Sequence, residues 1–147
     1  MRVYADMVAD LFHHGHVEFL KQARSLGDYL IVGVMGDHDT TGGKRHAILT
    51  VEERVAVVAA CRYVDEAIPN APWRIDSDWI AQHHIDLVVH GDDFPKQELD
   101  YYYRVPIDMG MFRTIPYTHG ISTTEIIFRC KEAELGSKTP LSSVQPV

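Results

Sequence analysis

The sequence predicts one α/β domain, built as a doubly wound parallel sheet with helices on both faces. Two observations lead to this prediction. Strand-like apolar runs alternate with runs of helical spacing along the chain, an order that favours a parallel sheet covered by helices. The run Tyr29–Met35 is apolar on both faces, as expected for a strand in the middle of such a sheet.

Local patterns indicate each element in turn. Val17, Leu20 and Ala23 have helical spacing, and Thr50 with Glu53 three residues later forms a capping-box pattern that starts a helix. The expected elements are, in order, a strand at Arg2–Met7, a helix at 15–26, a strand at Tyr29–Met35, a helix at 50–61, a strand at 64–68, a helix at 76–84, strands at 86–90 and 111–116, and a helix at 122–131. The stretch before the last strand is less regular. About five parallel strands result, in a Rossmann-like arrangement.

Composition limits the classes of partner. The chain has 147 residues, and 14 Lys plus Arg against 21 Asp plus Glu give a net charge of −7, which argues against nucleic-acid binding. No apolar run approaches the roughly 20 residues that cross a bilayer, and we expect no membrane partner and no secretory signal. Cys61 and Cys130 lie in apolar or helical patterns, which predicts reduced core residues of a cytoplasmic protein.

The chain divides into a domain and a tail. Residues 1–135 are expected to form the domain. Residues 136–147 contain two prolines, three serines and no aromatic residue, which predicts a disordered tail or a linker to a following domain.

The loops after the strands hold the residues with chemistry, because parallel sheets bind ligands at the carboxyl ends of their strands. His13 and His16 are three apart at the first strand-to-helix turn, and Gly15 removes a side chain where a phosphate would approach the backbone. Two imidazoles and the helix amides suit a phosphorus centre that gains negative charge. A surface histidine cluster or a zinc site are the alternatives, although zinc needs three or four ligands.

A second group of candidates precedes the last helix. Ser122, Thr123 and Thr124 can hold phosphate oxygens together with the helix amides, or can simply cap the helix. With the histidine turn, they give two anion-binding helix ends in one parallel sheet.

These motifs resemble those of the HxGH nucleotidyltransferases. His13-His-Gly-His16 is similar to the HxGH signature, and Ile121-Ser-Thr-Thr124 with Arg62-Tyr-Val-Asp-Glu66 resembles the cytidylyltransferases that act on glycerol 3-phosphate, choline phosphate and ethanolamine phosphate. The resemblance covers residues 3–129. It implies in-line transfer of CMP from CTP to a phosphate-bearing alcohol with release of pyrophosphate. It also implies Mg²⁺ held by the CTP phosphates with no protein ligand, and a homodimer in which residues 62–66 pack across a two-fold interface.

The resemblance also implies roles for individual residues. Catalysis is expected of His13, His16 and Lys44. Nucleotide binding is expected of Val8, Ala9, Asp10, Gly15, Arg62, Asp93, Tyr117, Thr118, Ile121, Ser122 and Thr123. Acceptor binding is expected of Asp37, Trp73, Asp92, Lys96 and Tyr103. The alternatives are a solvated loop lysine for Lys44, salt bridges on helix surfaces for Arg54 and Arg62, and a core aromatic for Trp73.

The sequence departs from the family pattern at several positions. Met7 and Ala9 replace a glycine and a phenylalanine, and Tyr117 replaces an arginine. Lys96 stands where choline enzymes carry an aromatic residue, and a lysine would repel a quaternary ammonium.

This variant pattern is most similar to the cytidylyltransferase domains of the bifunctional enzymes of fosfomycin biosynthesis. It implies 2-hydroxyethylphosphonate as the acceptor and a phosphoenolpyruvate mutase domain after the tail. Ethanolamine phosphate or glycerol 3-phosphate as acceptor, a CTP-binding module without turnover, and an adenylyltransferase are the alternatives.

Overall fold

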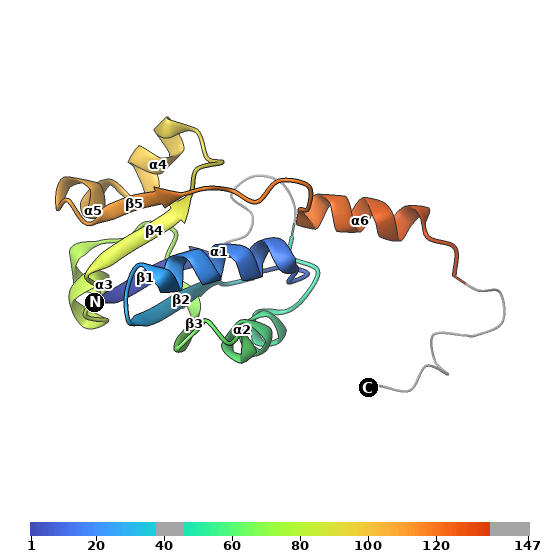
Figure 1. The fold of residues 1–147 in the computed structure, drawn as a ribbon, viewed down its shortest axis with the longest axis horizontal. Coiled ribbons are helices and arrows are strands. Elements are labelled where there is room, and N and C mark those ends of the chain that lie inside the picture. The colour runs from blue at the N-terminus through green and yellow to red at the C-terminus, as the bar shows by residue number, and fades with distance from the viewer. Residues whose placement is uncertain (38–45, 136–147) are drawn as a thin grey trace.

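The computed structural model, which describes residues 1–37 and 46–135, contains a five-stranded parallel sheet in the order β3-β2-β1-β4-β5. Figure 1 shows the arrangement. The strands are β1 (Arg2–Met7), β2 (Tyr29–Met35), β3 (Glu66–Ala71), β4 (Leu87–Gly91) and β5 (Phe112–Ile115). The helices are α1 (His14–Ser25), α2 (Val51–Ala60), α3 (Ser77–Gln82), α4 (Lys96–Tyr102), α5 (Arg104–Asp108) and α6 (Thr123–Glu132). The predicted Rossmann-like α/β class is confirmed.

Strand order determines where a ligand can bind. From β1 the chain builds outward through β2 to β3, then returns to place β4 on the other side of β1; Val3 pairs with Leu30 on one side and Leu87 on the other. The order in which strands are added to the parallel sheet therefore reverses between β1 and β4. In open parallel sheets, ligands bind at the carboxyl ends of the strands at such a point.

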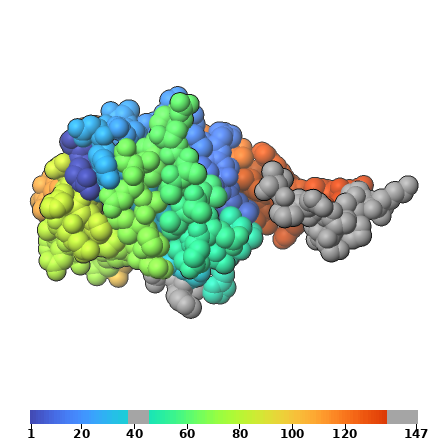
Figure 2. All heavy atoms as spheres, turned by 90° about the horizontal axis from the view of Figure 1, so that it is seen from below, coloured from blue at the N-terminus to red at the C-terminus, as the bar shows by residue number. Residues whose placement is uncertain are grey.

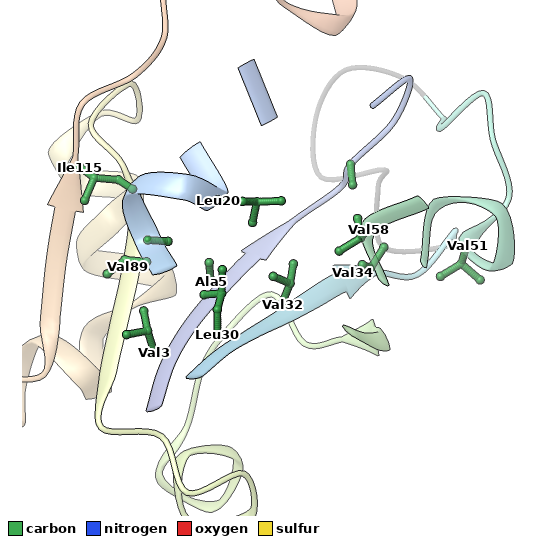
Figure 3. Close-up of a cluster of buried hydrophobic side chains, with 12 residues drawn as sticks. Val3, Ala5, Leu20, Leu30, Val32, Val34, Val51, Val58, Val89 and Ile115 are labelled. Carbon is green, nitrogen blue, oxygen red and sulfur yellow. The ribbon is translucent and has the colours of Figure 1, made fainter. Parts of the chain in front are cut away.

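Two layers of helices cover the sheet. Side chains alternate along β1, so that Val3 and Ala5 face α1 and α2, whereas Tyr4 faces α3, α4 and α5. Figure 3 shows the first layer, in which Leu20 of α1 and Val58 of α2 lie against the valines of the strands. On the second face, Tyr4 packs with Ile80 and Tyr103.

The predicted start of the second helix is confirmed. Thr50 precedes α2, and its side-chain oxygen accepts the Glu53 N–H at 3.3 Å, while the Glu53 carboxylate accepts the Thr50 N–H at 3.0 Å. These reciprocal bonds satisfy amides that a helix end would otherwise leave unpaired.

The expectations for the middle of the chain need correction. The third strand begins at Glu66 rather than at residue 64, because the Val64 N–H bonds the Cys61 carbonyl in a turn after α2. The stretch expected to be irregular contains α4 and α5, neither of which has a side-chain cap. Both cysteines are free thiols, but Cys130 is exposed and Cys61 only half-buried, so neither is a core residue.

Helix α6 projects from the rest of the domain. It extends away from the sheet in Figures 1 and 2, and none of its residues is buried. No helix in the described ranges, 1–37 and 46–135, is long and apolar enough to cross a membrane.

Candidate functional site

A cavity of about 440 Å³ lies at the carboxyl ends of β1 and β4, where the order of strand addition reverses. Its walls come from the segments after β1 and β4, from the start of α1, and from the segment that leads into α6. Three of its side chains are carboxylates, Asp6, Asp10 and Asp93, and three are histidines, His13, His16 and His90. Among the described residues that line it, none is Lys or Arg.

His13 and His16 form the start of α1. The Gly15 N–H donates to His13 Nδ1 at 3.1 Å, and the His13 N–H donates to His16 Nδ1 at 3.0 Å. The two rings lie 4.0 Å apart, between centroids. A β-carbon on Gly15 would lie 2.8 Å from His13 Cε1, so the glycine makes this arrangement possible.

Burial sets the charge of both rings, and these hydrogen bonds set which ring nitrogen carries the proton. Burial lowers the pKa of His16 to about 4, and burial followed by repulsion from His14 lowers the pKa of His13. Both rings are therefore neutral near pH 7. Because Nδ1 accepts a backbone hydrogen bond in each, the single ring proton resides on Nε2. Each ring can thus donate one N–H to a phosphate oxygen.

The start of α6 lies beside the start of α1. Ser122 caps α6 by accepting the Glu125 N–H at 3.0 Å, and the Thr123 hydroxyl donates to the Asp10 carbonyl at 3.0 Å. The cavity therefore lies next to the N-termini of two helices, whose amides and dipoles favour an anion. Asp10 itself accepts the amides of Ile48 and Leu49 at 2.8 and 3.0 Å, so its carboxylate holds the chain around the cavity.

Asp6 and Tyr103 form a second group of residues in the lining of the cavity. Asp6 is 4 % exposed, and the Tyr103 hydroxyl donates to its Oδ1 at 2.5 Å. Its Oδ2 is buried and has no hydrogen-bond partner within the described part of the chain. Burial raises the pKa of Asp6 to about 6, an effect that His90 and the Tyr103 hydroxyl partly offset.

Aromatic rings line the same cavity as this carboxylate. His90 packs against Phe94 and Tyr103, with centroids 4.5 and 5.2 Å away, and Trp73 packs against Tyr102 at 5.7 Å. All five rings line the cavity. A cavity that combines a carboxylate with aromatic rings is suited to an organic cation.

The structure brings most of the predicted site residues together. Those that line the cavity are Val8, Ala9, Asp10, His13, Gly15, His16, Trp73, Asp93, Tyr103, Tyr117, Thr118, Ile121, Ser122 and Thr123. Those that do not line it are Asp37, Arg62, Asp92 and Lys96. Lys44 lies outside the described residues.

The four residues outside the cavity have other surroundings. The Lys96 side chain is 87 % exposed, and its amine pairs with Asp100 one helical turn away, at 2.7 Å. Asp92 is exposed and accepts the Tyr117 N–H at 2.9 Å. Asp37 pairs with Arg54 at 2.7 Å, and Arg62 is exposed after α2.

Several residues in or behind the lining were not predicted, among them Asp6, His90 and Arg54. Asp6 and His90 are the penultimate residues of β1 and β4, and the indication in the sequence was a carboxylate in an otherwise apolar strand. The alternative for Arg54, a salt bridge on a helix surface, is wrong because its side chain is fully buried. No group of three or more His, Cys, Asp or Glu side chains able to hold a metal occurs in 1–37 and 46–135, so this part of the chain offers no zinc site.

Comparison with known proteins agrees with this geometry. Residues 5–129 match the cytidylyltransferase-like family. The chain belongs to that family. It is 48 % identical over 135 residues to the ethanolamine-phosphate cytidylyltransferase of Arabidopsis thaliana, covering 86 % of this chain and 32 % of that protein. It is 45 % identical over 133 residues to choline-phosphate cytidylyltransferase A of Mus musculus, covering 88 % and 36 %.

A solved structure gives the same result for the fold. The crystal structure of the lipopolysaccharide core biosynthesis protein from Thermoplasma volcanium GSS1 has a TM-score of 0.65 and 25 % identity, over 82 % of this chain and 98 % of that one. The chain spans about a third of the length of the curated relatives named above. The family expected from the HxGH and Ile-Ser-Thr-Thr motifs is thus confirmed.

Proposed function

We propose that this chain transfers CMP from CTP to a small phosphorylated amino alcohol, with ethanolamine phosphate as the expected acceptor, and releases pyrophosphate. The observation that carries the choice of acceptor is the buried Asp6 carboxylate in a cavity lined by aromatic rings. Membership of the cytidylyltransferase-like family supports the reaction, and two relatives named for ethanolamine phosphate and choline phosphate support the class of acceptor.

Two groups of lining residues suit the two substrates: His13 and His16 suit the nucleotide, and Asp6 with Tyr103 suits the acceptor. An oxygen of the acceptor phosphate attacks the α-phosphorus of CTP, forming a new P–O bond as the bond to pyrophosphate breaks on the opposite side. The Nε2–H groups of His13 and His16 donate to oxygens of the phosphate that gains charge. The amides at the starts of α1 and α6, with Ser122 and Thr123, orient the remaining oxygens. Lys44 is proposed to neutralise oxygens of both substrates.

Magnesium is proposed to enter with the nucleotide. In the described ranges the chain has no cluster of metal ligands, and both Asp10 oxygens already accept backbone amides. The triphosphate oxygens would therefore supply most of the coordination, as is usual for Mg²⁺ at such sites. The ion would offset charge in a cavity whose described lining has no Lys or Arg.

The unpaired Asp6 Oδ2 favours a primary ammonium. A buried carboxylate oxygen without a donor is costly, and a primary ammonium carries three N–H donors. A trimethylammonium offers no donor. The terminal hydroxyl of 2-hydroxyethylphosphonate offers one donor but no charge. The phosphonate was inferred from the variant motif pattern and from Lys96, and Lys96 pairs with Asp100 at the surface.

A pyrophosphate-release assay tests the reaction. CTP and ATP are each combined with ethanolamine phosphate in the presence of Mg²⁺, with each nucleotide alone as the control for hydrolysis. We expect pyrophosphate only with CTP and only when the acceptor is present. Acceptor-dependent turnover with ATP but not with CTP would indicate an adenylyltransferase. If the chain binds CTP but releases no pyrophosphate with ethanolamine phosphate or with other small phosphates and phosphonates, it is a nucleotide-binding module.

The chain is also proposed to form a homodimer through residues 62–66, as the family resemblance implies. Arg62 is exposed at this turn, beside the edge strand β3. Light scattering coupled to size exclusion should give twice the mass of one chain at micromolar concentration. A mass equal to that of one chain would contradict the dimer.

A further inference from the structure

Arg54 joins three parts of the backbone around the cavity. Its Nη1 donates to the carbonyls of Val8 and Met35, each at 2.7 Å, and its Nε donates to the Leu49 carbonyl at 3.1 Å. Its Nη2 donates to the Asp37 carboxylate at 2.7 Å. One guanidinium on α2 therefore fixes the chain after β1, the end of β2, and the segment that leads into α2.

Two of these carbonyls belong to the wall of the cavity. Val8 and Met35 both line it, so the guanidinium lies directly behind the wall and not in the cavity itself. Asp10 holds the same segments from the other side, because its carboxylate accepts the amides of Ile48 and Leu49. The wall next to His13 and His16 is thus held by a buried cation and a buried anion.

Stability alone is a poor explanation for this arginine. The guanidinium is fully buried, whereas its carboxylate partner Asp37 is 46 % exposed. Desolvating a charge is costly, and buried ion pairs often contribute no more to stability than apolar side chains of the same size. A planar fork with fixed donor directions can, however, align several carbonyls at once, which a lysine ammonium cannot do.

We propose that Arg54 is a positioning residue for the nucleotide end of the cavity, an inference that rests on the proposed binding of CTP. It sets the backbone at Val8 and Met35, so that the wall beside the two histidines has the shape that receives the triphosphate. The acceptor end, at Asp6 and Tyr103, has no hydrogen bond to this guanidinium.

The test is Arg54→Lys, with CTP affinity measured by calorimetry in the presence of Mg²⁺ and without acceptor. We expect the Kd for CTP to rise about tenfold or more, because small displacements of a binding wall are costly. The KM for the acceptor should stay within twofold of the wild-type value. Since no acceptor is present in the binding measurement, a wrong choice of acceptor would leave this result intact.

Two matched variants separate positioning from stability. Thr50→Ala removes the cap of the same helix and lowers stability without touching the guanidinium. Arg104→Lys makes the same change in an exposed pair with Asp108. Both should bind CTP as the wild type does. The proposal is overturned if folded Arg54→Lys binds CTP normally, if Thr50→Ala weakens CTP equally, or if Arg54→Lys fails to fold even at low temperature.

Discussion

Replacing His16 with alanine should lower kcat by about 10²–10³-fold while the domain keeps its fold. His16 is held by the backbone of His13 and offers Nε2–H to the cavity, so its loss removes a donor aimed at the reacting phosphate. The hydrogen bond from His16 to the phosphate is strongest in the transition state, when negative charge develops on the phosphate oxygens. The Kd for CTP should therefore change much less than kcat.

His14→Ala is the matched control. His14 is exposed, adjoins the same turn and does not line the cavity, so its variant should keep kcat within a few-fold of the wild-type value. Steady-state kinetics with calorimetry would measure both variants. An active His16→Ala enzyme would remove this residue from the chemistry.

Replacing Asp6 with asparagine should affect activity and stability in opposite directions. The kcat/KM for ethanolamine phosphate should fall about 100-fold, because the amide keeps the shape of the side chain but loses the charge that holds the ammonium. CTP binding should not change. The free energy of unfolding at neutral pH should rise by up to about 3 kcal/mol, since the variant no longer buries an ionised carboxylate whose pKa is about 6.

The raised pKa also gives a pH dependence with a definite sign. Ammonium binding needs the ionised carboxylate, so the acceptor KM should rise as pH falls through about 6. For folding, the folded chain holds this proton more tightly than the unfolded chain, whose carboxyl has a pKa near 3.8. The stability contributed by Asp6 is therefore present below about pH 4 and is lost as pH rises through 6. Asp6→Asn should remove both dependences.

Asp108→Asn serves as the control for the amide substitution, since Asp108 is exposed and pairs with Arg104 at the surface. It should alter neither the acceptor KM nor its pH profile. A variant at Asp6 that turned over ethanolamine phosphate normally would show that the carboxylate does not hold the acceptor.

Most of the fold followed from local pattern. The alternation of strand and helix patterns predicted all five strands, and Thr50 with Glu53 predicted the start of α2. The beginning of β3 was misplaced because Val64 is an apolar residue that packs on the core from a turn. Helices α4 and α5 were missed because neither has a capping side chain and a proline lies within α5.

Local sequence pattern alone predicted only part of the site, and Trp73, Asp93 and Tyr103 were placed there through the family resemblance. The histidines and hydroxyls lie within short motifs at helix starts, so spacing alone pointed to them. Asp6 meets Tyr103 from 97 residues away, and Arg54 meets Val8 from 46 residues away. Such roles depend on tertiary packing, which no local pattern contains. Lys96 shows the converse: a motif position indicated a role, and one exposed helical pair with Asp100 directs its side chain elsewhere.

The comparison of acceptors tests the proposed function most directly. The kcat/KM values with CTP would be measured for ethanolamine phosphate, choline phosphate and 2-hydroxyethylphosphonate, using one enzyme preparation at neutral pH. A buried carboxylate oxygen that needs a charged N–H donor predicts that ethanolamine phosphate exceeds each of the other two by about tenfold or more. A value for the phosphonate or for choline phosphate at or above that for ethanolamine phosphate would contradict the assignment of Asp6 as the group that selects a primary ammonium.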